Sequence, residues 1–245
     1  FRRVLFRSIM EDLAGSVQGD HFVGLNDDEI DMAIEQAVRL HAPRWGDPTL
    51  DAMAPQPSTV DERAEHLAMI YGLLLPAFLA RLGDRLDEAI VGVVNDFAPN
   101  VGRWARGSGS PLTVTHYDFR PDNFLFARSP DAPPLVVVDW QTANQGLGAV
   151  DLAYVIASSS PPGRRPGEDE LVRSYRDRLA SRGISYDFDT CWRDYRFGAL
   201  WGLIITVLAT SMAAQTERGD DLFVRMASQY GYQSIELDSL ELVRS

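Results

Sequence analysis

The sequence predicts an α+β fold that is mostly helical and contains a small β-hairpin section. Apolar residues recur with helical spacing before residue 97 and again in the last third of the chain. Between these regions, residues 112–138 contain short apolar runs bounded by turn residues, a pattern typical of strands. With 245 residues and a hydrophobic fraction of 45%, the chain is long and apolar enough to bury a substantial core.

Three helices are expected in the first part of the chain. The first follows Asn26 and Glu29, which have the spacing of a capping box, and ends near residue 41. The second is predicted over residues 60–82, with a kink or an interruption at Pro76, and the third over residues 85–96.

Three short strands are predicted, over residues 112–115, 124–127 and 135–138. If the last two pair antiparallel with Ala127 opposite Leu135, then Asn123 lies opposite Asp139. Directly opposed residues in such a pair have Cβ atoms roughly 4.5–5.5 Å apart. A carboxamide and a carboxylate are therefore expected to converge at the open end of the hairpin.

These two side chains suit a magnesium site. Magnesium takes oxygen ligands, keeps several waters and completes its coordination with substrate phosphates. Asp118 precedes Asn123 on the loop that leads into the hairpin. Phosphoryl transfer needs a metal that neutralises phosphate charge and a loop carboxylate that accepts the proton of an attacking hydroxyl.

Residues 116–123, HYDFRPDN, resemble the HGDxxxxN catalytic loop of the aminoglycoside and choline kinase-like phosphotransferases, which are relatives of the protein kinases. Residues 139–141, DWQ, resemble the metal-binding DFG-like triplet of that family. The resemblance implies the C-terminal lobe of a protein-kinase-like fold, with the N-terminal lobe largely missing.

The resemblance also assigns roles to individual residues. It implies that Asp118 is the catalytic base, that Asn123 and Asp139 bind Mg²⁺, and that His116 braces the loop. Asp151 matches a family aspartate that supports the loop from behind.

An acidic segment near the start of the chain resembles the hinge between the two lobes, where backbone groups hydrogen-bond the adenine of ATP. Its residues are Met10, Glu11, Asp12 and Leu13. Residues 1–8 look like a translated sequencing adapter and are interpreted as a non-native leader. The expected organisation is then an N-lobe remnant with the hinge over residues 9–25, and the catalytic C-lobe over residues 26–245.

Three departures from the family pattern bear on activity. Tyr117 replaces the glycine between His and Asp, and the triplet is DWQ. Kinases of this kind also hold the ATP phosphates with an N-lobe lysine. All 23 basic residues here are arginine. We therefore expect this chain, as a fragment, to transfer phosphate negligibly.

Composition restricts the partners. A formal net charge of −12 argues against nucleic acid or an anionic membrane, and on its own favours a cationic substrate. The single cysteine, Cys191, excludes an internal disulfide and fits a reducing, cytoplasmic location. No N-terminal stretch has the composition of a signal peptide.

Residues 197–215 lack any charge and are open to two readings, a membrane span or a buried helix. Glycine, threonine and serine are frequent in this run, and large apolar residues are scarce in its second half. These features favour the buried helix.

The sequence favours an ATP-dependent phosphotransferase that acts on a small-molecule hydroxyl or amino acceptor. Two alternatives stay open. One is a non-catalytic binding protein that keeps the kinase scaffold. The other is a metal-dependent hydrolase that uses His116, Asp118 and Asp139, which would need a further ligand.

Overall fold

The computed structural model describes residues 15–53, 59–129, 132–161 and 167–244. The helices are α1 (Asp27–His41), α2 (Val60–Leu82), α3 (Glu88–Phe97), α4 (Val101–Ala105), α5 (Gly148–Ser158), α6 (Glu168–Ser181), α7 (Phe188–Gly198), α8 (Leu200–Met212) and α9 (Glu217–Glu236). The strands are β1 (Ser16–Gln18), β2 (Thr113–Thr115), β3 (Phe124–Ala127), β4 (Leu135–Val137) and β5 (Asn144–Gly146). The predicted α+β class, mostly helical with short antiparallel strands, is confirmed.

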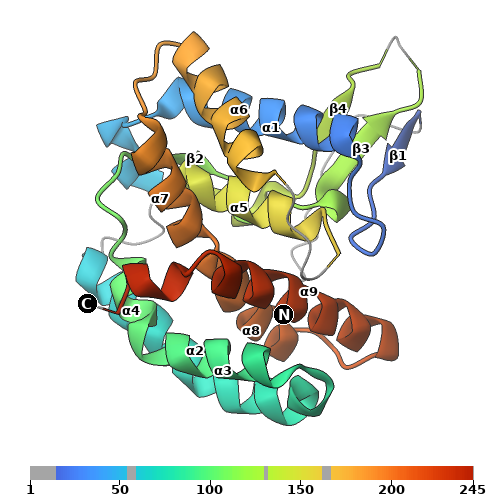
Figure 1. Cartoon of the computed structure of the whole chain (residues 1–245), viewed down its shortest axis with the longest axis vertical. Helices are drawn as coiled ribbons and strands as arrows, with labels where there is room; N and C mark the ends of the chain where they lie inside the picture. Colours follow the sequence, from blue (N-terminus) through green and yellow to red (C-terminus); the bar gives the residue numbers. More distant parts are fainter. Residues whose placement is uncertain (1–14, 54–58, 130–131, 162–166, 245) are drawn as a thin grey trace, which may run out of the picture.

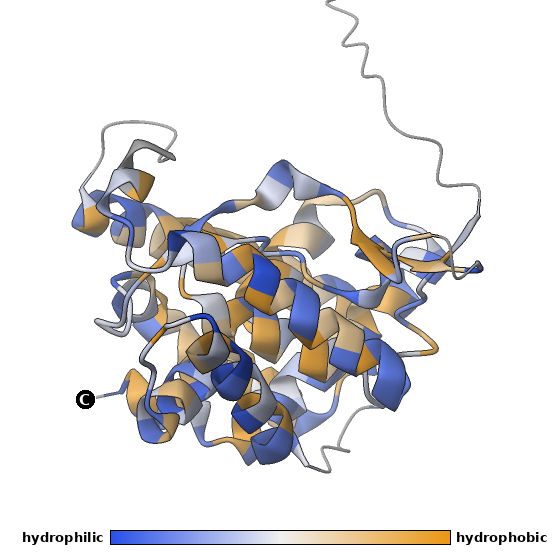
Figure 2. Ribbon diagram, turned by 90° about the horizontal axis from the view of Figure 1, so that it is seen from above, coloured by the Kyte–Doolittle hydropathy of each residue, from blue (hydrophilic) through white to orange (hydrophobic). Residues whose placement is uncertain are grey.

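The elements form two halves (Figure 1). Helices α1, α5, α6 and α7 lie with the strands in one half, and α2, α3, α4, α8 and α9 lie in the other. Each half has its own cluster of buried apolar residues, and the hydrophobic colouring follows the inward faces of the helices (Figure 2).

Helix α5 joins the two clusters. Val150 and Tyr154 belong to one cluster, whereas Leu152 and Val155 belong to the other. All eleven residues of α5 are buried. A helix that is buried on every side is covered by other elements on every side, which places α5 at the centre of the molecule.

The predicted capping box begins α1. Asn26 Oδ1 accepts the backbone N–H of Glu29 at 3.0 Å, and Glu29 Oε2 accepts the backbone N–H of Asn26 at 2.9 Å. Thr59 and Glu62 make the same reciprocal pair at the start of α2. Each box satisfies two N–H groups that have no partner within the helix. Helix α2 continues through Pro76.

Two small antiparallel sheets carry the loops of interest. Strands β1, β3 and β4 form the first, in that order, and β2 pairs with β5 in the second. The predicted strands correspond to β2, β3 and β4. Strands β1 and β5 were not predicted, since SVQ and NQG are three residues long and mostly polar.

The predicted register of the hairpin is wrong by one residue. Phe126 pairs with Leu135 and Phe124 with Val137, so Asn123 faces Val138 rather than Asp139. The backbone N–H of Val138 donates to Asn123 O at 2.9 Å, in agreement. The predicted strand start at Leu135 is correct, but Ala127 lies opposite Pro134 instead of Leu135. The carbonyl of Pro134 accepts a bond from Ala127 N at 3.1 Å, which shortens the loop by one residue.

The charge-free run at residues 197–215 is not one helix. Helix α7 ends at Gly198 and α8 begins at Leu200. A Cβ on Gly198 would lie 2.8 Å from Ala149 O, so glycine allows this chain segment to approach α5 closely. Two helical stretches of the described residues are long and apolar enough for a membrane span, Val60–Arg85 and Phe188–Met212. In the second stretch, 61% of the most apolar 18-residue segment is buried inside the protein. This burial agrees with the buried helix that the sequence favours over a membrane span.

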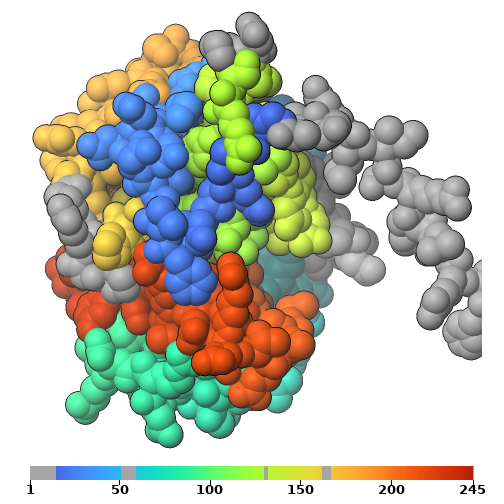
Figure 3. Space-filling view, turned by 90° about the vertical axis from the view of Figure 1, so that its right-hand side faces the viewer, coloured from blue at the N-terminus to red at the C-terminus, as the bar shows by residue number. Residues whose placement is uncertain are grey.

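The segment after β1 crosses to the C-terminal helix (Figure 3). His21 Nε2 lies 2.7 Å from Gln229 Oε1, and Arg225 Nε donates to His21 O at 3.0 Å. Both partners belong to α9. These contacts fix the edge of the sheet that contains β3, and β3 directly follows the 116–123 loop.

Candidate active site

A buried carboxylate on α5 holds the 116–123 loop. Asp151 Oδ2 accepts the backbone N–H of His116 at 2.6 Å, and Asp151 Oδ1 accepts that of Tyr117 at 2.8 Å. His41 Nε2 lies 3.2 Å from the same carboxylate. Burying a carboxylate is costly unless it is fully hydrogen-bonded, and these three contacts satisfy it. Asp151 therefore lies behind the loop and fixes its backbone.

His116 connects this loop to β4. Its Nδ1 is 3.3 Å from Asp118 N and its Nε2 is 3.0 Å from Val138 O. These partners fit the tautomer with hydrogen on Nε2, which donates to the carbonyl and leaves Nδ1 to accept. The ring also packs edge-on against Trp140, with centroids 4.9 Å apart. His116 thus links the residue before Asp139 to Asp118.

Asp118 and Asn123 are hydrogen-bonded across the loop. Asn123 Nδ2 donates to both the backbone oxygen and Oδ2 of Asp118, at 2.8 Å each. Because the amide nitrogen is used in this way, Oδ1 of Asn123 is the atom available to a cation. The other carboxylate oxygen of Asp118 lies 3.4 Å from the Tyr154 hydroxyl.

Arg120 binds two carboxylates of the loop. Its Nε donates to Asp118 Oδ1 at 3.0 Å and its Nη1 to Asp122 Oδ2 at 2.9 Å. Burial alone would lower the pKa of Arg120, but Tyr154, Asp118 and Asp122 raise it above its ordinary value. Burial raises the pKa of Asp122, and the charge of Arg120 opposes that rise. The guanidinium therefore remains charged and orients Asp118.

Asp139 lies immediately after the residue that pairs with Asn123. Its backbone is left-handed, with φ 65° and ψ 58°, and its side chain is exposed. Gln141 Nε2 is 3.5 Å from Asp139 Oδ2. This left-handed residue interrupts the regular alternation of side chains along the strand. The direction of the Asp139 carboxylate therefore does not follow from the pairing of β4. Asn123 and Asp139 are oxygen donors on adjoining backbone, a set that fits Mg²⁺ together with phosphate and water.

Tyr117, where the family pattern has glycine, also has a left-handed backbone, with φ 63°. The Tyr117 hydroxyl is 3.3 Å from Gln145 O. A Cβ added to Gly146 would lie 2.2 Å from the same Tyr117 hydroxyl oxygen, so glycine leaves room for the phenol. Burial, followed by the charge of Asp151, raises its pKa to about 12. The side chain therefore packs against β5 as a neutral phenol.

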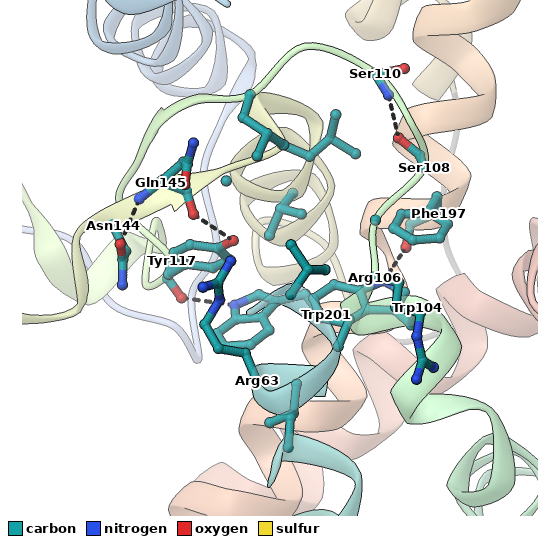
Figure 4. A pocket seen from close by; sticks show the side chains of 18 of the residues that line it. Arg63, Trp104, Arg106, Ser108, Ser110, Tyr117, Asn144, Gln145, Phe197 and Trp201 are labelled. Carbon is teal, nitrogen blue, oxygen red and sulfur yellow. Dashed lines mark hydrogen bonds between the residues drawn. The ribbon is translucent and has the colours of Figure 1, made fainter. Parts of the chain in front are cut away.

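A pocket of about 580 Å³ opens beside Tyr117 (Figure 4). An aromatic row forms one side of it. Tyr117 and Trp201 have centroids 4.8 Å apart, Trp201 and Trp104 5.9 Å, and Trp104 and Phe197 5.8 Å. Trp201 Nε1 donates to the backbone oxygen of Tyr117 at 2.8 Å, which joins this row to the loop. The pocket thus adjoins the residue that precedes Asp118.

The loop therefore brings together His116, Asp118 and Asn123, with Asp151 behind them and Asp139 at the adjoining strand end. Sequence reasoning missed Arg120 and Tyr154. The arginine could have been found from its place two residues after Asp118, where it can reach back to that carboxylate. Tyr154 carries no such signal, since it is one apolar position among many on α5.

Two predictions receive no support from this geometry. The hinge residues Met10, Glu11, Asp12 and Leu13 lie outside the described residues. Within the described ranges, no group of three or more His, Cys, Asp or Glu side chains could hold a metal ion, so no observation favours the hydrolase.

Comparison with known proteins gives one family. The model of the phosphotransferase enzyme family (APH) matches residues 4–193. Among solved structures, the chain is similar to the crystal structure of a protein from Ralstonia eutropha JMP134 that is assigned as an aminoglycoside phosphotransferase. The identity is 16% and the TM-score 0.45, over 90% of this chain and 70% of that one. No curated protein matches the sequence.

Proposed function

Because this chain belongs to the phosphotransferase enzyme family, we propose that it transfers a phosphoryl group from ATP to a hydroxyl or amino group of a small molecule. The observation that carries the proposal is the Asp118–Asn123 pair, 2.8 Å apart on a loop whose backbone is fixed by Asp151. A loop carboxylate and a carboxamide are the parts that phosphoryl transfer needs beside a metal.

Asp118 is the proposed base. Its two oxygens offer about four lone-pair positions, and the contacts with Asn123, Arg120 and Tyr154 leave room for an incoming hydroxyl. As the acceptor oxygen bonds to phosphorus and the bond to the ADP leaving group breaks, the acceptor proton passes to Asp118. His116 and Arg120 hold the base in place and do not contact the acceptor.

Asn123 and Asp139 are the proposed magnesium ligands. The ion would supply positive charge against the phosphate oxygens, which lowers the cost of bringing a nucleophile to them. We further propose that residues 10–13 form the hinge that contacts adenine and that residues 26–245 form the C-lobe. The proposed partners are a nucleotide and a small-molecule substrate, without nucleic acid or membrane.

We propose in addition that the chain alone transfers phosphate negligibly, so the reaction is tested on an extended protein, in which the N-terminal lobe that the family resemblance implies is added. The extended protein is given Mg²⁺–ATP and a panel of hydroxyl and amino compounds. We expect ADP release that depends on an acceptor and stops when EDTA removes the metal. Asp139→Asn should weaken Mg²⁺–ATP binding about ten-fold or more in a calorimetric titration, because one anionic ligand is lost. Asp189→Asn, an exposed aspartate on α7, is the matched control and should bind normally. Unchanged affinity in Asp139→Asn, or an extended wild-type protein without acceptor-dependent ADP release, would refute the proposal.

A further inference from the structure

The pocket beside Tyr117 differs in charge from the chain as a whole. The net charge of the sequence is −12, yet the described residues that line the pocket include Arg63 and Arg106 and no aspartate or glutamate. The nearby carboxylate of Asp61 is already committed, since it accepts a bond from Arg106 Nε at 2.6 Å. The described lining residues thus include two cationic side chains and no anionic one.

This charge distribution disfavours a cationic ligand. An ammonium group that leaves water needs carboxylates to replace its hydration, and next to guanidinium groups it would be repelled. A polycation, which would need several carboxylates, is disfavoured most strongly.

The shape and chemistry of the pocket favour a flat, largely apolar ligand. Trp104, Trp201 and Phe197 stack on one another in one row along the same side of the pocket (Figure 4), and Trp201, which is only half-buried, is the most exposed of the three. Aliphatic residues complete the apolar surface; they are Leu67, Leu112, Leu147, Val150 and Ile205. A ring of hydroxyl and amide side chains can bond polar substituents; its members are Ser108, Ser110, Thr142, Asn144 and Gln145.

The pocket reaches the residue that precedes the proposed base. The Trp201 indole that faces the pocket donates to the carbonyl of Tyr117 at 2.8 Å, and Tyr117 is followed directly by Asp118. A ligand stacked on Trp201 therefore lies against the group that holds the catalytic loop.

Resting on the proposed function, we infer that the acceptor bound in this pocket is an aromatic hydroxyl compound without a cationic group. Trp201 determines the specificity for its ring, and amines and polyamines are disfavoured because no carboxylate occurs among the described residues of the lining. The overall acidity of the chain points the other way, but none of the described residues that line this pocket is acidic.

The class is tested by NMR titration of the full chain, without nucleotide, using tryptophol and tryptamine. These probes share the indole ring and the two-carbon arm, and differ in a hydroxyl against an ammonium group. We expect tryptophol to bind about ten-fold more tightly than tryptamine, and kanamycin to bind more weakly than both. Equal or tighter binding of tryptamine or kanamycin, or no binding of tryptophol, would overturn the inference.

Two variants locate the effect. Trp201→Ala should weaken tryptophol binding about two- to ten-fold through the lost stacking, whereas Trp192→Ala, on α7 outside the pocket, should not. Arg63→Glu places a carboxylate at an exposed position on α2 and should reduce or reverse the preference over tryptamine. Because this position is exposed, the variant gives a result even if Trp201→Ala fails to fold. Unchanged probe affinities in Arg63→Glu would contradict the assignment.

Failure of the inference and failure of the proposed function give different results. If tryptophol binds with these preferences but the extended protein phosphorylates neither it nor any other acceptor, the pocket assignment is supported and the reaction is refuted. If the extended protein phosphorylates kanamycin and tryptophol stays unbound, the reaction is supported and the assignment is refuted.

Discussion

At the scale of single residues, the candidate site is organised by polar groups that each make more than one bond. Asp151 accepts from two backbone N–H groups, His116 spans the loop and β4, and Asn123 contacts Asp118 twice. Such shared bonds fix the loop geometry, because moving one residue breaks contacts made by its neighbours.

The residues of the loop could be predicted from sequence because they are close together in the chain. The contacts that hold them could not. Asp118 and Asn123 are five positions apart, whereas Tyr154 reaches Asp118 from 36 positions away. His41 reaches Asp151 across 110 positions. No local pattern encodes contacts made by the packing of two helices against a loop.

A buried histidine near the site gives a prediction on pH. Burial, and then the charge of Arg120, lower the pKa of His21 from 6.5 to about 3. Between these values the unfolded chain binds a proton that the folded chain does not. The free energy of unfolding should therefore fall as pH decreases from about 6.5 to about 3, by at most about 1.4 kcal/mol per pH unit, and this histidine should have no effect above that range.

The measurement is urea unfolding across this range. His21→Gln should show a shallower loss of stability than wild type, whereas His66→Gln, which replaces an exposed histidine on α2, should follow wild type. If the His21→Gln and wild-type slopes coincide, the histidine is not held neutral in the folded protein.

At the scale of elements, helix starts were easier to predict than strand pairing. The Asn26–Glu29 box lies within four residues, so its bonds are local, and it marks the start of α1 as predicted. The hairpin register depended on whether Pro134 joins the ladder, which its residue type does not decide. The break at Ala199 depends on the approach of Gly198 to α5, a contact between distant segments.

Two helical glycines give opposite predictions. Gly72 is exposed on α2 and an added Cβ meets nothing within 4 Å, whereas at Gly202 on α8 it would lie 2.3 Å from Tyr230. Gly72→Ala should raise the free energy of unfolding by about 0.5–1 kcal/mol through helix propensity. Gly202→Ala should lower it by about 1–3 kcal/mol through overpacking.

Both changes are measured by urea unfolding under one condition. Each variant serves as the control for the other, because the substitution is identical and only the space differs. A Gly202→Ala protein at least as stable as Gly72→Ala would show that α8 and α9 do not pack as described.

At the scale of the whole molecule, α5 connects the site to both hydrophobic clusters. Asp151 projects from this helix to the loop, and Tyr154 from the same helix reaches the proposed base. The family and the α+β class could be predicted from the loop, the strands and their order. The pocket could not, because α2, α4, α7 and α8 contribute to it from widely separated parts of the chain.

The central claim is that Asp118 is the base of a phosphoryl transfer, and one comparison of turnover tests it most directly. Asp118→Asn keeps the shape of the side chain and removes its ability to take a proton. In the extended protein, we predict that acceptor-dependent ADP formation falls about 10²- to 10⁴-fold, with Mg²⁺–ATP affinity nearly unchanged and Asp189→Asn at wild-type turnover. Wild-type turnover in Asp118→Asn would contradict the claim.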